Sequence, residues 1–283
     1  MGIVNVTPDS FSDGGRFLDV KAAIDHAVRL VREGAAIIDV GAESTRPGAE
    51  RVPAMEQLRR ALPVVRALTA EGVLVSIDTT LASVAEAAFE CGAVAVNDVA
   101  AGTEDPRMLD VVARRGAAIV LMHRLHPPER DAYSDRYRAG ERPAYGDVVR
   151  AVAGFLAERR RAAVATGVAP ERIAIDPGLG FGKTVAQNYA LVARIDELVR
   201  GGSPVLIGAS RKSFLGAAAG GVPPDQRLPG SLAAISAAYL RGARLFRVHD
   251  VAASRQALAV AKEVVEAAVE GAGSGATIAF PPG

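Results

Sequence analysis

Eight short, mostly apolar runs recur along the chain, and stretches with helical spacing separate them. Each run is rich in valine and isoleucine and is continuous rather than alternating, as in parallel strands buried on both faces. The runs cover residues 2–6, 35–41, 73–79, 93–99, 117–123, 172–178, 204–210 and 245–250. Strand followed by helix, eight times over, predicts an α/β fold of the (β/α)8 TIM barrel type, with its active site at the C-terminal ends of the strands.

The alternative to a closed barrel is an open, doubly wound sheet, which also alternates strands with helices. The segment GLGFG at 178–182 resembles the nucleotide-binding turn of such sheets. It fails as a dinucleotide fingerprint because Lys183 stands where the third glycine is required. It fails as a phosphate-binding P-loop because Pro177 stands where the first glycine is required. The barrel is therefore the preferred prediction.

Length and composition fit one large domain, expected over residues 1–270, with a flexible glycine-rich tail over 271–283. The net charge of +1 provides no general attraction for nucleic acid or a membrane surface. The single cysteine, Cys91, is interpreted as a small buried residue. No apolar run is long enough to span a membrane, and the N-terminus lacks the pattern of a signal peptide, so we expect a cytoplasmic protein.

Polar side chains gather at the ends of the predicted strands, where a barrel places its active site. Asp98 and Asp250 are interpreted as helix caps. Asp78 and Asp176 each follow an isoleucine in a buried run, where an unpaired carboxylate is costly, and this favours a functional role. His123 fits a core position and a site position equally well. The strand ends carry Asn5, Asp39, Asp78, Asn97, Met122, His123, Asp176, Ser210, Arg211, Lys212, Arg247 and His249.

Basic groups follow the last two predicted strands. Lys212 comes after the seventh strand, and Arg247 and His249 close the eighth. The loops after these two strands of a barrel commonly bind phosphate, so three basic groups there indicate an anion site. The turn ESTRPGA at 43–49 holds Arg46 in a rigid Arg-Pro unit whose planar guanidinium suits a carboxylate or a pyrophosphate.

Taken in order, these segments resemble the dihydropteroate synthase family of pterin-binding barrels. The resemblance runs from residue 2 to about residue 265. It implies condensation of 6-hydroxymethyl-7,8-dihydropterin diphosphate with 4-aminobenzoate to give 7,8-dihydropteroate and diphosphate, as well as a homodimer and sensitivity to sulfonamides. The segments are NVTPDSFSDGG, DVGAESTRPGA, SIDTT, NDVAAG, LMH, IDPGLGFGKT, GASRKSF and RVHDV.

The same resemblance implies a set of site residues. It assigns catalytic roles to Asp13, Asp78, Lys212, Arg247 and His249. It implies Mg²⁺ bound through Asn5 and phosphate oxygens, with the diphosphate against Asn5, Arg247 and His249. The implied pterin pocket consists of Asp78, Asn97, Met122, Asp176, Phe181 and Lys212. The aminobenzoate is expected to contact Thr45, Arg46, Pro47 and Ser213, with its carboxylate near the helix that starts after Lys212.

An aromatic amine is unprotonated at neutral pH, so the reaction needs no strong base, whereas the leaving diphosphate develops charge that the cations can stabilise. A dissociative path is expected because the electron-rich dihydropterin delocalises a methylene cation. Asn5 is expected to stay fixed and residues 7–15 to be poorly ordered without ligands, as a loop that carries Phe11 and Asp13 and closes over the substrates.

The chain departs from the family pattern in three places. Ala42 replaces a glycine, which is expected to restrict the backbone of that loop. Residues 124–146 form a longer and more charged segment than is usual after LMH, and we expect a mobile rim there. The chain starts almost inside the first strand, so a truncated or misassigned start is expected, and with it a less stable first strand. Two rival functions are a folate-dependent methyltransferase and a catalytically silent pterin-binding paralogue.

Overall fold

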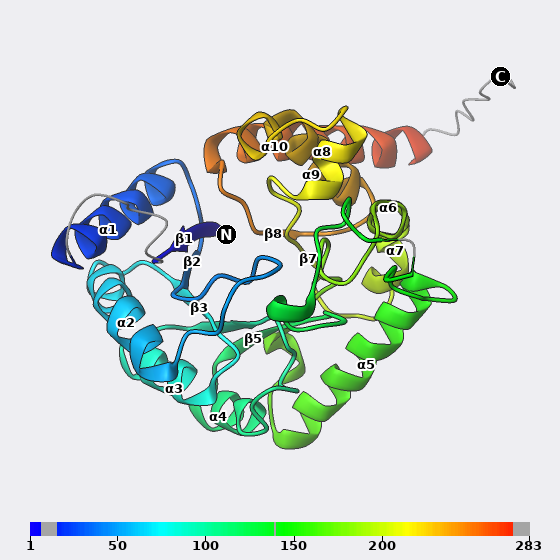
Figure 1. Ribbon diagram of the computed structural model, residues 1–283. Helices are drawn as coiled ribbons and strands as arrows, with labels where there is room; N and C mark the ends of the chain where they lie inside the picture. Colours follow the sequence, from blue (N-terminus) through cyan, green and yellow to red (C-terminus); the bar gives the residue numbers. More distant parts are fainter. Residues whose placement is uncertain (7–15, 139, 274–283) are drawn as a thin grey trace, which may run out of the picture.

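Eight parallel strands form a closed barrel surrounded by helices (Figure 1). The computed structural model describes residues 1–6, 16–138 and 140–273. All eight predicted strands are present but shorter than the apolar runs. The strands are β1 (Gly2–Asn5), β2 (Ile38–Gly41), β3 (Val75–Asp78), β4 (Ala95–Asp98), β5 (Ala118–Met122), β6 (Ile173–Asp176), β7 (Leu206–Ile207) and β8 (Leu245–Phe246).

The barrel closes through two single bridges. Strands β1 to β6 pair in order, and β7 pairs with β8. Val205 bridges Ile175 next to β7, and Val248 bridges Gly2 beyond β8. These bridges join the two sheets at both edges, so the open doubly wound alternative is wrong and the barrel prediction is confirmed.

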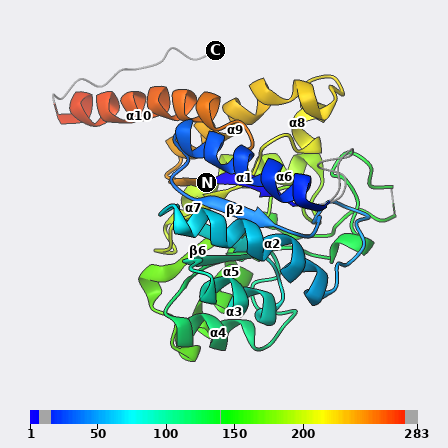
Figure 2. The same ribbon diagram turned by 90° about the vertical axis from the view of Figure 1, so that its left-hand side faces the viewer.

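Helices follow the strands and cover the outside of the barrel, as Figures 1 and 2 show. Two of the connections between successive strands, β6 to β7 and β7 to β8, contain two α-helices each. The helices are α1 (Arg16–Arg32), α2 (Ala54–Ala70), α3 (Ala82–Glu90), α4 (Met108–Arg115), α5 (Val148–Thr166), α6 (Val185–Ala193), α7 (Ile195–Val199), α8 (Ser213–Ala218), α9 (Leu228–Leu240) and α10 (Val251–Gly273), with short 3-10 turns η2 (Pro128–Arg130), η3 (Pro170–Arg172) and η4 (Pro224–Gln226). None of the described helices is long and apolar enough to cross a membrane.

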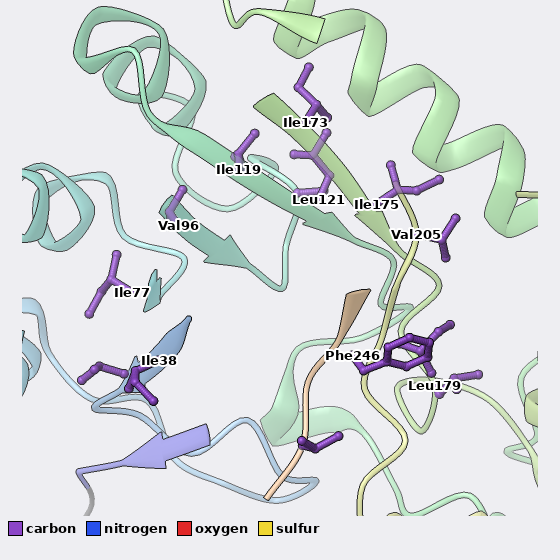
Figure 3. Close-up of a cluster of buried hydrophobic side chains, with 14 of the residues drawn as sticks. Ile38, Ile77, Val96, Ile119, Leu121, Ile173, Ile175, Leu179, Val205 and Phe246 are labelled. Atoms are coloured by element: carbon purple, nitrogen blue, oxygen red, sulfur yellow. The ribbon is translucent and has the colours of Figure 1, made fainter. Parts of the chain in front are cut away.

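The main core lies between the strands and the helices. Every second residue of a strand points to this layer, because successive strand side chains alternate between faces. Figure 3 shows part of it, a chain of branched side chains that follows the strands around the barrel. Ile38, Ile77 and Val96 belong to this layer and are fully buried. The alternate residues face the barrel axis, and at the C-terminal ends these are the polar ones.

The first strand is paired on both sides. Gly2 to Asn5 are in register with Ile38 to Gly41. On the other side, the Met1 amino group donates to Phe246 O at 2.9 Å, and Val248 N–H donates to Met1 O at 3.0 Å. The expectation of a poorly supported first strand therefore differs from the structure. The expected division into residues 1–270 and a tail stays a prediction, and α10 continues to Gly273.

Candidate active site

The register of the sheet brings the predicted site residues to one end of the barrel. Asn5 pairs with Gly41, Gly41 with Asp78, and Asp78 with Asn97, which forms one row across four strands. Met122 pairs with Asp176 at the ends of β5 and β6. Asp78, Asn97, Met122 and Asp176 are all buried. The carboxylate and amide side chains of Asn5, Asp78, Asn97 and Asp176 therefore lie at the same end of the barrel, as the sequence predicted.

Arg247 forms a fork with two carboxylates in this mouth. Its Nε donates to Asp39 Oδ2 at 2.6 Å, and its Nη2 donates to Asp78 Oδ2 at 2.7 Å. The side chains of Asp39, Asp78 and Arg247 are 0%, 6% and 19% exposed. Asn97 Nδ2 donates to the same oxygen of Asp39 at 3.1 Å. Asp39, which the sequence marked only as a strand end, is thus the residue that orients Arg247.

Each carboxylate keeps one oxygen for a further partner. Asp39 Oδ1 and Asp78 Oδ1 are buried and accept no hydrogen bond from the part of the chain that the structure describes. Burial raises the pKa of Asp78 to about 7, although Arg247 opposes the shift. Burial also acts on Arg247, but the charges of Asp39 and Asp78 outweigh it and raise the pKa of that guanidinium. Arg247 therefore stays positively charged at neutral pH, whereas the protonation of Asp78 depends on the pH and on the groups next to it.

The Asp176 carboxylate and the Lys212 ammonium both lie next to Gly208. An added Cβ at Gly208 would lie 3.8 Å from Asp176 Oδ2 and 3.9 Å from Lys212 Nζ, so the glycine leaves this space open. Gly178 N–H donates to Asp176 Oδ1 at 2.7 Å, which leaves Oδ2 free to turn to a ligand. Burial raises the pKa of Asp176 and lowers the pKa of Lys212 to about 8.

The turn between β6 and α6 holds Lys212 in place. Lys212 Nζ donates to Leu179 O and lies 4.5 Å from the centre of the Phe181 ring. Gly178 has a φ of 66°, and an added Cβ would lie 1.9 Å from His123 O. Only glycine therefore fits this position. The glycine pattern serves the packing of this turn and not a nucleotide.

Lys183 supports the same turn from behind. Its side chain is fully buried, and its Nζ donates to Gly178 O at 2.9 Å and to Phe181 O at 2.8 Å. His123 Nδ1 lies 3.0 Å from the same amine. Burial lowers the pKa of Lys183 to about 7 and that of His123 to about 3. His123 is thus a core residue. No sequence pattern marked Lys183 as buried, because His123, one of its partners, lies 60 positions away.

His249 is held by the neighbouring strand end. His249 N–H donates to Ser210 Oγ at 3.3 Å, and Nδ1 lies 3.0 Å from the same hydroxyl. Burial and the positive charge of Arg247 lower the pKa of His249 to about 4, so the ring is neutral at pH 7. When Ser210 donates to Nδ1, the ring proton is on Nε2 and is available to an anion.

Asn5 offers an oxygen beside the aspartates. An added Cβ at Gly41 would lie 3.5 Å from Asn5 Oδ1 and 3.7 Å from Asp78 Oδ2, so glycine leaves a space between two oxygens. The described residues contain no group of three or more His, Cys, Asp or Glu that could hold a metal ion. An amide oxygen beside a carboxylate oxygen is a donor type that suits a hard cation such as Mg²⁺, which takes its other ligands from phosphate and water.

The remaining predicted residues lie on loops around this mouth. Thr45, Arg46 and Pro47 follow β2, with Arg46 exposed, and Ser213 begins α8 and is buried. Asp13 and the loop 7–15 lie outside the described residues. Ala42 is buried and is not among the described non-glycine residues with positive φ, which are Ala101 and Arg211, so alanine fits there without strain.

Residues 128–134, within the segment 124–146 that is expected to be a mobile rim, are hydrogen-bonded to other loops of the mouth. Pro128 O accepts a hydrogen bond from Gly48 N–H at 2.8 Å. Asp131 Oδ2 accepts from Gly182 N–H at 2.9 Å, and Ser134 N–H donates to Ser213 Oγ at 3.2 Å. The segment is therefore attached to three loops of the mouth, which its charged composition did not indicate.

Comparisons with known proteins agree with this geometry. The family of pterin binding enzymes matches residues 1–249. A dihydropteroate synthase of Mycobacterium leprae is 50% identical over 266 residues, which cover 92% of this chain and 91% of that protein.

Two solved structures of the dihydropteroate synthase of Xanthomonas albilineans are also similar. The one with 4-aminobenzoic acid is 47% identical, has a TM-score of 0.84, and covers 93% of this chain and 92% of that one. The complex with 7,8-dihydropteroate is 44% identical, has a TM-score of 0.81, and covers the same shares. The predictions of family and enzyme class are confirmed: the chain belongs to the dihydropteroate synthase family of pterin-binding enzymes.

Proposed function

We propose that the protein condenses 6-hydroxymethyl-7,8-dihydropterin diphosphate with 4-aminobenzoate to give 7,8-dihydropteroate and diphosphate. One observation carries the proposal. Two pairs of opposite charge, Asp176 beside Lys212 and Asp78 bonded to Arg247, lie at the same barrel mouth, with both carboxylates buried and both cations partly buried. The first pair suits a flat heterocycle with adjacent donors and acceptors, and the second suits a charged leaving group beside it.

The pterin is proposed to lie over Gly208, between Asp176 and Lys212. The Asp176 carboxylate would accept two-point hydrogen bonds from adjacent N–H donors of the amino-pyrimidine edge, one at Oδ2 and one at Oδ1, which also accepts from Gly178 N–H. Asn97 and Met122 would line the pocket, and Phe181 would pack against the ring system beside Lys212. The open space at Gly208 supports this placement, because a side chain there would fill it.

The diphosphate is proposed to lie against Asn5, Arg247 and His249. The guanidinium already bridges Asp39 and Asp78, so its orientation is fixed before the anion arrives. The neutral His249 would donate from Nε2. Mg²⁺ would be held by Asn5 Oδ1 together with diphosphate oxygens and water, and when bound it would stabilise the charge on the leaving group.

The aminobenzoate is proposed to contact Thr45, Arg46, Pro47 and Ser213. Arg46 is exposed and makes no side-chain hydrogen bond within the described residues, so its guanidinium is available to the carboxylate or the ring. The Ser213 hydroxyl accepts from Ser134 N–H and therefore keeps its own proton for the carboxylate.

The bond between the pterin methylene carbon and the diphosphate oxygen breaks first, and its electron pair leaves with the diphosphate. Arg247 and His249 stabilise that charge as it forms. Asp78 lies beside Arg247 and, when ionised, stabilises the positive methylene carbon. The amine nitrogen then forms the new carbon–nitrogen bond and releases its proton to water. Asp13 is proposed as a further catalytic residue from the family pattern alone.

The protein is also proposed to be a cytoplasmic homodimer. Leu240 of α9 and Val260 and Val264 of α10 are 51%, 63% and 53% exposed on neighbouring helices. Figure 2 shows α10 extending past α9, and these three apolar side chains are exposed in one copy. A symmetric contact between two copies would cover it, and a net charge of +1 per chain opposes this little.

The test is to incubate the protein with the pterin diphosphate, 4-aminobenzoate and Mg²⁺ and to look for dihydropteroate by chromatography. Product at a rate above that of Arg247→Ala supports the proposal. Binding of the pterin without product favours the silent paralogue. Methyl transfer from a methylated folate, with no dihydropteroate formed, favours the methyltransferase.

A further inference from the structure

We infer that Asp131 and its neighbours in the loop after β5 position the aminobenzoate subsite. This inference rests on the proposed function. The proposed subsite is built from the loops that carry Arg46 and Ser213, and the loop of Phe181, a proposed pterin contact, adjoins it through Lys212. Residues 128–134, named the anchoring segment, make a hydrogen bond to each of these loops.

The first two attachments fix the walls of the subsite. Pro128 O accepts from Gly48 N–H at 2.8 Å, directly after the Arg-Pro turn. Asp131 Oδ2 accepts from Gly182 N–H at 2.9 Å, directly after Phe181. Asp131 thus holds the residue that follows Phe181, whose ring packs on Lys212. A shift of the anchoring segment would therefore move both walls together.

Asp131 is itself held in one orientation. Its Oδ1 accepts from the Tyr137 hydroxyl at 2.5 Å and from Ala132 N–H at 2.9 Å. Both carboxylate oxygens are engaged, so the side chain is not free to rotate away from Gly182. Tyr145 also helps to fix Gly182, since the Tyr145 hydroxyl donates to Gly182 O at 3.0 Å.

The third attachment orients the hydroxyl that is proposed to meet the carboxylate. Ser134 N–H donates to Ser213 Oγ at 3.2 Å, and both serines are buried. Asn188, fully buried in α6, donates to Ser134 Oγ at 3.0 Å and accepts from Gly180 N–H at 2.6 Å. Ser213 is thereby coupled through Ser134 and Asn188 to the same glycine turn that Asp131 holds.

A consequence separates the two substrates. The polar pterin contacts proposed here, such as Asp176 and Asn97, are made from strand ends and do not involve the anchoring segment, whereas Phe181 is the apolar pterin contact next to it. Loss of the Asp131 carboxylate should therefore weaken the aminobenzoate subsite and leave pterin recognition nearly intact. A general loss of packing would instead impair both substrates and the turnover.

The test compares steady-state constants of the wild type, Asp131→Ala, Asp131→Asn and the control Asp135→Ala. Asp135 is exposed directly after the anchoring segment, so its removal matches the change in charge. We expect Asp131→Ala to raise the KM for 4-aminobenzoate about tenfold, with the KM for the pterin diphosphate changed less than about twofold, because a hydrogen bond to a charged acceptor is lost. Asp135→Ala should behave as the wild type.

Asp131→Asn keeps one acceptor oxygen, so an intermediate rise of about threefold is expected, and this variant decides the question if Asp131→Ala does not fold. An unchanged KM for 4-aminobenzoate in a folded Asp131 variant would overturn the inference, as would an equal rise for both substrates. A wild type that makes no dihydropteroate would instead refute the proposed function. Calorimetric binding of 4-aminobenzoate to the wild type and Asp131→Ala then still tests the positioning role.

Discussion

The fork of Arg247 with Asp39 and Asp78 gives the sharpest prediction, because its removal leaves two buried carboxylates without their cation. The two carboxylates are 0% and 6% exposed. Breaking one partner from a buried pair typically costs ~3–5 kcal/mol. We expect Arg247→Met to lose about that much free energy of unfolding at about pH 8 and to reduce turnover by ~10²–10³, as for a lost preorganised donor.

The loss should depend on pH in a defined direction. The pKa of Asp78 in the folded protein is raised from 3.8 to about 7, and Arg247 is the charge that limits this rise. Without Arg247 the pKa of Asp78 in the folded protein rises further. As pH increases, the free energy of unfolding falls until this pKa is passed, so the variant continues to lose stability above about pH 7, where the wild type no longer does. The deficit should therefore be smaller at about pH 5.5 than at about pH 8, by ~1 kcal/mol or more.

Urea unfolding followed by circular dichroism at both pH values, in the same salt, measures this difference. The matched control is Arg211→Met, since Arg211 pairs with Asp250 at the surface with side chains 41% and 23% exposed. That pair should contribute ~0–1 kcal/mol, with no comparable pH dependence. A deficit of the same size at both pH values, or one as small as that of the control, would refute the reasoning.

Three further predictions concern the glycine turn and its lysines. Lys212, with a pKa of about 8, should give kcat/KM a fall above about pH 8, and whatever activity Lys212→Arg retains should not show that fall. The pKa of Lys183 drops from 10.5 to about 7 on folding, so unfolding free energy should rise with pH between these values in the wild type and rise less in Lys183→Met. Gly178→Ala should lower the thermal midpoint more than Gly116→Ala. An added Cβ at Gly116 has no neighbouring atom within 4 Å, so that substitution should reduce the free energy of unfolding by only ~1–2 kcal/mol.

Much of the fold was predictable because each strand is a local pattern. The eight apolar runs contain all eight strands, and their polar ends identified Asp78, Asn97 and Asp176. The strands are shorter than the runs because pairing stops where the chain turns towards a helix. The start of the chain looked weak for the same reason: the sequence shows no neighbour for β1, whereas the barrel supplies β2 and Val248.

The partners of the site residues were not predictable in the same way. Asp39 meets Arg247 across 208 positions of sequence, and Ser134 meets Ser213 across 79. Lys183 is a buried charge that in the sequence stood out only as the residue in place of a glycine in a nucleotide-binding turn, because no local pattern marks a lysine that packs inside. Charge content likewise suggested a mobile segment after β5, although Asp131 uses its charge to accept hydrogen bonds from the protein itself.

The turn from Gly178 to Gly182 has a consequence for resistance to inhibitors. The acceptors that this turn itself offers to Lys183 and Lys212 are main-chain oxygens, those of Gly178, Leu179 and Phe181. No single substitution deletes a main-chain oxygen, and a side chain at Gly178 collides with the end of β5. An inhibitor that engages Lys212 at this turn would therefore leave few escape mutations, whereas one that depends on the side chains of the aminobenzoate loops would leave many.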